Sequence, residues 1–171
     1  WIVNCRTTVF VCLSLIMATP QAQAGDLPKS FDGAWQLDTQ ASQSLDAILK
    51  GLGYGWFARK VMGTLAVRQV IKNRPKGLAI RVLTRFSDDT IVLPADNRWA
   101  MSRTLDGGQT ERRSRWLENE PVLVTEDRFK TGLLTTVRRR VNKRTFHEEL
   151  KFETAGKAPL TAVRVFRRKG N

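Results

Sequence analysis

The chain has 171 residues, and its 29 Lys and Arg against 16 Asp and Glu give a formal net charge of +13 at pH 7. It shows no repeat, long linker or low-complexity stretch, so the length predicts one domain with one core and excludes a multidomain arrangement. Such a charge favours contact with anionic surfaces, such as lipid headgroups, lipopolysaccharide or nucleic acid, although a solvated basic face without a dedicated partner has the same composition.

The first 24 residues have the features of an export signal. Arg6 precedes an apolar run over residues 9–18, and Ala22-Gln23-Ala24 follows as a small-x-small cleavage site. The run is short for a transmembrane helix, and an uncleaved membrane anchor is the alternative. We therefore predict a signal peptide over residues 1–24, a single domain over residues 25–171, and a periplasmic or secreted location.

Both cysteines, Cys5 and Cys12, lie inside this predicted signal. The exported chain would then have no disulfide, no thiol nucleophile and no Cys-based metal site. Export without disulfides suits a periplasmic or secreted bacterial protein better than a small disulfide-stapled domain.

A strand and two short helices are predicted over residues 31–64. In the strand, alternation places four residues on one face: Phe31, Gly33, Trp35 and Leu37. In the first helix, Leu45, Ile48, Leu49 and Leu52 have helical spacing, and Ser42 or Ser44 is the candidate N-cap. Glycines 51, 53 and 55 then break this helix and allow a tight reversal before the second one.

The rest of the chain reads as strands joined by short turns. The expected strands are 65–72, 78–84, 90–93, 99–105, 110–117, 122–129, 133–141, 146–152 and 160–168. Consecutive strands of this kind form an antiparallel meander, which removes its exposed edges by closing on itself. With the first strand, the pattern predicts an all-β fold, a ten-stranded antiparallel up-and-down barrel with both helices between strands 1 and 2. Side chains do not fill so wide a barrel, so we expect an internal cavity.

This order of motifs resembles the intracellular lipid-binding proteins, the fatty-acid-binding protein family of the calycin superfamily. The motifs are Gly33-Ala34-Trp35-Gln36-Leu37, Leu45-Asp46, Leu52-Gly53-Tyr54-Gly55 and Arg59-Lys60. The chain departs from the family in a slightly longer link before Leu45, in the absence of an aromatic residue at Leu45, and in its export signal. Across residues 31–169 the resemblance implies a lipid-binding-protein-like barrel with a helical cap over a water-filled ligand cavity.

Charged residues on otherwise apolar faces mark the candidate site. Alternation in 133–141 places Arg139 with Leu133, Val137 and other apolar residues, and so predicts that it enters the interior. A buried cation needs a carboxylate, and Glu148 on the adjacent strand could supply it. Arg112 is a further inward candidate. In the last strand the pattern leaves open which face is inside.

The resemblance adds a role for two of these arginines. Family members that hold a fatty-acid carboxylate use an Arg in the third-last strand and an Arg-x-Tyr in the last strand. Arg139 matches the first and Arg164-Val165-Phe166 the second, with Phe166 in place of the Tyr. Two interpretations remain, a ligand anchor and an internal ion pair with Glu148.

The second helix carries a candidate portal or membrane contact. Trp56 and Phe57 lie beside Arg59 and Lys60, a combination that fits a helix meeting an anionic bilayer. The alternative is that these aromatics pack onto the barrel rim.

Catalytic and metal-binding patterns are not found in the sequence. His147, the single histidine, lies in the opposite phase to Phe146 and Glu148, which predicts a solvent-facing side chain. Glu148 and Glu149 are adjacent and point to opposite faces, so they cannot act as a catalytic carboxylate pair. There is no phosphate-binding loop and no metal-ligand spacing. We therefore expect no enzymatic activity, no catalytic residue, no metal and no cofactor.

Two functions follow as hypotheses. The first is a monomeric carrier of a long-chain fatty acid or a similar apolar ligand, which Arg139 and Arg164 would hold by its carboxylate. The second is a basic envelope protein that binds anionic lipid headgroups or another partner on its surface. Nucleic acid is not expected, because no aromatic platform alternates with basic residues on one face.

Overall fold

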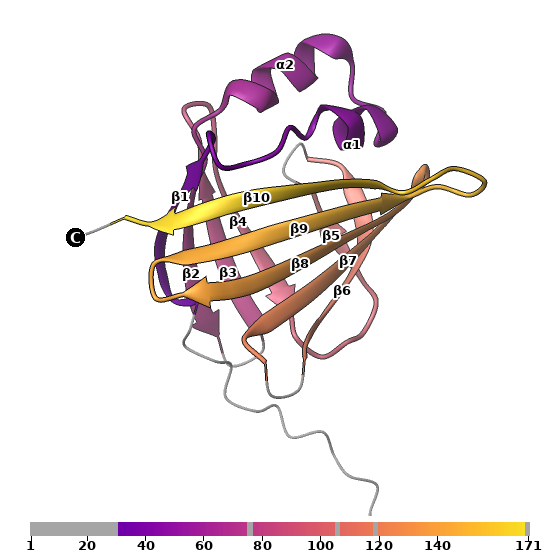
Figure 1. Cartoon of the computed structure of the whole chain (residues 1–171). Helices are drawn as coiled ribbons and strands as arrows, with labels where there is room; N and C mark the ends of the chain where they lie inside the picture. Colours follow the sequence, from indigo (N-terminus) through magenta and orange to yellow (C-terminus); the bar gives the residue numbers. More distant parts are fainter. Residues whose placement is uncertain (1–30, 75–76, 105–106, 118–119, 170–171) are drawn as a thin grey trace, which may run out of the picture.

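The computed structural model describes residues 31–74, 77–104, 107–117 and 120–169 (Figure 1). The predicted signal segment lies outside these residues. The strands are β1 Gly33–Asp38, β2 Arg68–Arg74, β3 Gly77–Leu83, β4 Asp88–Pro94, β5 Ala100–Arg103, β6 Gln109–Trp116, β7 Val122–Phe129, β8 Gly132–Asn142, β9 Thr145–Glu153 and β10 Leu160–Arg168. The helices are α1 Asp46–Gly51 and α2 Trp56–Thr64.

The strands form one antiparallel sheet that curls into a nearly closed barrel. Their order is β4-β3-β2-β1-β10-β9-β8-β7-β6-β5, so the first and last strands of the chain pair side by side. β4 and β5 are the two ends of the sheet, and a hollow of about 190 Å³ between them is lined by residues 89–91, Arg103, Thr104 and Gly107. Both helices cover one end of the barrel (Figure 1). The predicted fold class is therefore confirmed.

The link between β1 and α1 differs from the expectation at its cap. Leu45 is the N-cap of α1, so neither Ser42 nor Ser44 occupies that position. Ser44 Oγ accepts a hydrogen bond from the Asp46 N–H at 3.2 Å, while Ser42 Oγ accepts one from the Val165 N–H of β10 at 2.9 Å. Ser42 thus fastens the longer link to the barrel instead of capping the helix.

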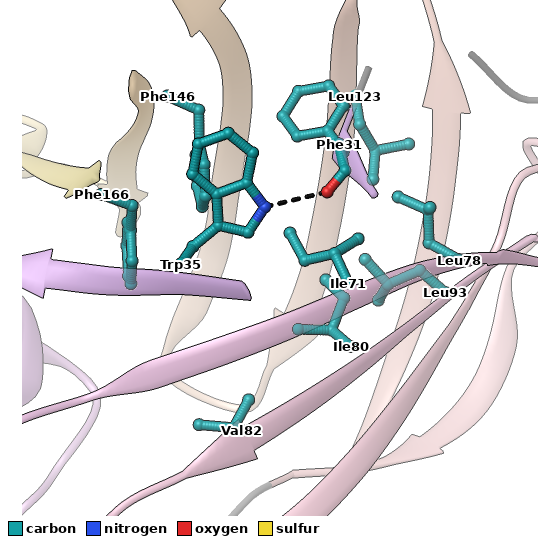
Figure 2. Packing of buried hydrophobic residues seen from close by; sticks show 10 residues of the cluster. All are labelled: Phe31, Trp35, Ile71, Leu78, Ile80, Val82, Leu93, Leu123, Phe146 and Phe166. Atoms are coloured by element: carbon teal, nitrogen blue, oxygen red, sulfur yellow. Dashed lines mark hydrogen bonds between the residues drawn. The ribbon is translucent and has the colours of Figure 1, made fainter. Parts of the chain in front are cut away.

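An aromatic core fills part of the barrel between β1, β9 and β10. Trp35 Nε1 donates to the Phe31 carbonyl at 2.9 Å, and Phe146 stacks on Phe166 with ring centroids 4.7 Å apart (Figure 2). Aliphatic residues of β2, β3, β4 and β7 complete the cluster: Ile71, Leu78, Ile80, Val82, Leu93 and Leu123. Burial of these side chains from water supplies the main favourable contribution to folding.

The two helices are attached to the barrel unequally. Ile48 of α1 packs with Phe152 of β9 and Ala162 of β10 in a second, smaller core cluster. α2 has no buried residue and packs mainly on α1. Neither helix among the described residues is long and apolar enough to span a membrane.

Candidate ligand site inside the barrel

The barrel interior has a polar wall and an apolar wall. The buried side chains of β6 and β7, with one from β8, are largely polar: Thr110, Arg112, Ser114, Thr125, Asp127 and Thr136. The buried side chains of β2, β3 and β4 are mostly aliphatic: Ile71, Leu78, Ile80, Val82 and Leu93. Because buried polar groups are costly without partners, each contact of the polar wall must be accounted for.

Four residues form a charged cluster at the meeting point of β2, β8, β9 and β10, and we call Gln69, Arg138, Glu148 and Arg164 the central cluster. Glu148 is only 3% exposed. Its Oε1 accepts hydrogen bonds from Arg138 Nε at 3.1 Å and from Gln69 Nε2 at 3.0 Å. Arg164 Nη1 lies 3.6 Å from the other oxygen, Oε2, which is ion-pair distance but long for a hydrogen bond.

The charges of the central cluster shift each other's protonation. Burial alone raises the pKa of the Glu148 carboxyl, but Arg138, Arg164 and the hydrogen bond from Gln69 outweigh it and hold that pKa below its usual value. Burial lowers the pKa of Arg164, Glu148 opposes this, and the like charge of Arg138 adds to it. Since Arg remains protonated in proteins, the cluster holds two cations and one anion.

A second ion pair lies on the polar wall. Arg112 Nε donates to Asp127 Oδ1 at 2.6 Å, and Arg112 Nη1 donates to Ser102 Oγ at 3.1 Å. Burial raises the pKa of Asp127, and the adjacent Arg112 opposes the shift. The predicted inward orientation of Arg112 is therefore confirmed, with its guanidinium already engaged.

The predicted inward orientation of Arg139 is wrong. Its side chain is 46% exposed on the outside of the barrel, where Nη1 lies 3.0 Å from Glu120 Oε2. The cause is a β-bulge. β8 and β9 pair Asn142 with Thr145 but Arg140 with Phe146, so one extra residue shifts the register and places Arg138 opposite Glu148. Sequence reasoning missed Arg138 because it took the face of Leu133, Val137 and Arg139 as the inner one, which a hairpin without the bulge would also have given.

The last strand settles the orientation that the pattern left open. Arg164 and Phe166 both face the interior, with Arg164 16% exposed and Phe166 fully buried. The guanidinium carbon of Arg164 lies 5.1 Å from the Phe166 ring centroid, within cation–π range. The predicted partner Glu148 does contact Arg164, and it binds Arg138 more closely.

The four portal candidates fall into two groups on α2. Trp56 and Phe57 are 64% and 73% exposed, so the alternative that they pack onto the barrel rim is wrong. Lys60 is also exposed. Arg59 is tied down instead, because it donates to Asp46 Oδ1 at 2.9 Å and to the Tyr54 carbonyl at 3.1 Å.

The histidine and the possible metal ligands of the described residues do not form a site. His147 lies in register with Arg139 and Val165, on the outward face of β9 as predicted. Within residues 31–169, gaps aside, His, Cys, Asp and Glu side chains form no group of three or more that could hold a metal ion.

By architecture the chain is an up-and-down antiparallel β-barrel capped by two helices. No protein-family model matches the chain. Over 72 residues, 42% of the chain, it is 32% identical to a fatty acid-binding protein homolog of Ascaris suum, and it spans 43% of that protein's length.

Solved structures confirm the resemblance at the level of the fold. The barrel is similar to the Schistosoma mansoni fatty acid binding protein in complex with arachidonic acid, with a TM-score of 0.70, 18% identity, and coverage of 85% of this chain and 100% of that one. It is also similar to As-p18, an extracellular fatty acid binding protein, with a TM-score of 0.64, 20% identity, and coverage of 84% and 99%. The chain therefore has the fold of the fatty-acid-binding proteins, as its sequence motifs indicated.

Proposed function

We propose that the protein binds and carries a long-chain fatty acid, or a similar apolar ligand with an anionic headgroup, inside the barrel. The observation that carries this proposal is the charge of the central cluster, where two largely buried arginine side chains share the single carboxylate of Glu148. A ligand carboxylate would neutralise the remaining positive charge. Removal of its acyl chain from water would add about 0.8 kcal/mol per buried methylene.

Arg164 is the better carboxylate anchor of the two arginines. Arg138 is hydrogen-bonded to Glu148 and reaches Thr125 Oγ1 at 3.4 Å, so its donors are largely engaged. Arg164 makes no side-chain hydrogen bond to any described residue, and its forked donors suit a carboxylate. Arg112 is held by Asp127 and Ser102, so it is a secondary contact at most. The ring of Phe166 would hold the Arg164 guanidinium in place by a cation–π contact.

The test is a titration of the delipidated protein with oleate, followed by calorimetry. The Arg164→Leu variant is expected to bind oleate roughly 10- to 100-fold more weakly, the effect of losing charge-assisted hydrogen bonds. Arg139→Leu is the matched control, since it removes an outward-facing arginine with a surface ion pair. Equal affinity of the two variants, or no binding by the unaltered protein, would refute the proposal.

We further propose that α2 forms the ligand portal and contacts membranes. Trp56 and Phe57 expose apolar surface, Lys60 adds a positive charge beside them, and α2 packs mainly on α1 rather than on the barrel. Amphipathic helices with exposed aromatics and basic residues partition into lipid interfaces. Arg59 would hold α2 to α1 through Asp46 rather than touch lipid.

A second candidate function rests on the positive surface. Four exposed basic residues lie in the β8–β9 turn and at the end of β10, and we call them the basic patch: Lys143, Arg144, Arg168 and Lys169. The two segments are adjacent, since the Arg168 N–H donates to the Arg144 carbonyl at 2.8 Å. This basic patch would bind anionic lipid headgroups with strong salt dependence. Sedimentation with phosphatidylglycerol vesicles tests it. Loss of vesicle binding in a Lys143→Ala/Arg144→Ala/Lys169→Ala variant that still binds oleate would assign vesicle binding to the patch.

For the location we propose the periplasm or the extracellular space, and for the oligomeric state a monomer. The signal-like segment over residues 1–24 supports export. As-p18, one of the similar structures, is described as extracellular. Cell fractionation with a C-terminal epitope tag tests the location, and light scattering of the purified protein tests the monomer.

A further inference from the structure

One acceptor of the central cluster has no hydrogen-bond partner among the described residues. Gln69 is 4% exposed, and its Nε2 donates to Glu148 Oε1 at 3.0 Å. Its carbonyl oxygen, Oε1, is buried and accepts no hydrogen bond from any described residue. A buried amide oxygen without a donor is unusual in folded proteins and destabilises them.

The chemistry of Glu148 fixes which way the Gln69 amide points. The lowered pKa keeps the Glu148 carboxylate ionised, and an ionised carboxylate only accepts hydrogen bonds. A flipped amide would place Oε1 of Gln69 against that carboxylate and lose the bond. The amide group must therefore face Glu148, which leaves Oε1 in need of a donor from elsewhere.

The side-chain donors of Trp35 and Arg138 are already engaged, and Arg164 makes no hydrogen bond to Gln69 in the structure. In the β1–β2 pairing Gln69 lies opposite Trp35, whose Nε1 donates to the Phe31 carbonyl. Arg138 donates to Glu148 and Thr125. The free acceptor thus belongs to the same cluster as Arg164, the proposed carboxylate anchor, and both residues are linked through Glu148.

We propose that the ligand donates a hydroxyl to Gln69 Oε1 while Arg164 holds its carboxylate, so that the preferred ligand is a fatty acid hydroxylated close to its carboxyl group. This inference rests on the proposed function. A carboxylate or an alkyl chain has no proton to donate, whereas a hydroxyl has one. Gln69 and Arg164 lie close together, because they contact the two oxygens of the Glu148 carboxylate. A ligand whose carboxylate lies on Arg164 would therefore reach Gln69 with a hydroxyl group only a few carbons from its carboxyl group, as in 2- or 3-hydroxy fatty acids.

The test compares four ligands on the delipidated protein: palmitate, 2-hydroxypalmitate, 3-hydroxypalmitate and ω-hydroxypalmitate. We expect one of the two proximal hydroxy acids to bind about tenfold more tightly than palmitate, the effect of satisfying one buried acceptor, with no such gain for the ω-hydroxy acid. In Gln69→Met, which keeps the side-chain length but removes the acceptor, the preference should disappear.

The outcomes separate this inference from the proposed function. Tight palmitate binding without any hydroxyl preference would overturn the inference, since water would then satisfy Gln69, and would leave fatty-acid carriage intact. A preference that persists in Gln69→Met would also overturn it, because another group must accept the hydroxyl. Failure of all four ligands to bind would refute fatty-acid carriage itself. Cooperative unfolding of Gln69→Met in urea serves as the check that the variant is folded.

Discussion

The two charged groups inside the barrel differ in how their charges are matched. Arg112 and Asp127 form a one-to-one pair with 2.6 Å between Nε and Oδ1, and both side chains are 8% exposed. The central cluster instead places two arginines on one carboxylate, and Arg164 stays 3.6 Å away from it. The first arrangement is complete by itself, whereas the second keeps a positive charge in a place where water is restricted.

This difference separates a structural role from a binding role. A buried cation needs a counter-charge, and for Arg112 the chain itself supplies one in Asp127. For the central cluster we propose that a ligand carboxylate provides the missing charge. Loss of charge in the pair should therefore affect stability alone, and loss of charge in the cluster should affect stability and ligand binding together.

Substitution of Glu148 is expected to have the largest effect. Glu148→Leu leaves Arg138 and Arg164 buried without an anion, which should lower the free energy of unfolding by about 3–5 kcal/mol. Oleate should restore part of this loss, because its carboxylate would take the place of Glu148. Urea denaturation with and without oleate measures both effects.

Glu149→Leu is the matched control for Glu148→Leu. Glu149 is adjacent in sequence but faces outward, 46% exposed and 3.9 Å from Arg139. Its replacement should change the unfolding free energy by no more than about 0.5 kcal/mol. Equal effects of the two substitutions would contradict the interior placement of the Glu148 charge.

Breaking the one-to-one pair should destabilise the barrel without weakening ligand binding. Arg112→Leu removes the cation that faces Asp127 and should lower the unfolding free energy at pH 7 by about 3 kcal/mol. Its affinity for oleate should stay within about twofold, a change of less than 0.5 kcal/mol. Calorimetric titration of the folded variant measures this affinity, and a large loss would show that Arg112 also holds the ligand.

Much of this arrangement could be predicted from the sequence because period-two patterns and turn residues are local signals. They indicated the barrel, the position of the helices, and the inward orientation of Arg112 and Glu148. They failed at β8 for two physical reasons. The rule that apolar residues face inward misleads where the interior wall is polar, and the bulge at Val141 shifts every earlier residue of the strand by one position.

Other features depend on contacts that no pattern records. The partial burial of Arg59 follows from its bond to Asp46, thirteen positions earlier in the chain. The free oxygen of Gln69 follows from its bond to Glu148, which is 79 positions away. The sequence pattern alone does not distinguish Gln69 from other polar residues of its strand.

Acid titration should distinguish the two groups by the sign of their effects. The pKa of Glu148 is lowered in the folded state, so its stabilisation is present above its ordinary value of 4.5 and is lost as pH falls through the native pKa. The pKa of Asp127 is raised, so its contribution is present below 3.8 and is lost as pH rises through the native pKa. Urea denaturation from pH 3 to pH 7 should therefore show that Glu148→Gln removes a loss of stability in acid, whereas Asp127→Asn removes a loss on raising the pH. Changes of the same sign in both variants would contradict the opposed pKa shifts.

The smallest effect on stability is expected on α2, which separates the proposed portal from the charged interior. Phe57 is 73% exposed, so Phe57→Ala should change the free energy of unfolding by no more than about 0.5 kcal/mol. Oleate affinity at equilibrium should also stay unchanged, since α2 contributes no residue to the central cluster.

The rate of oleate transfer to anionic vesicles should fall in Phe57→Ala, because the substitution removes apolar surface that would enter the lipid interface. Stopped-flow fluorescence with labelled vesicles measures this rate, and Val92→Ala, which trims a 58% exposed residue of β4, is the control for loss of apolar surface elsewhere. An equal reduction by both substitutions would mean that transfer depends on general surface hydrophobicity and not on α2.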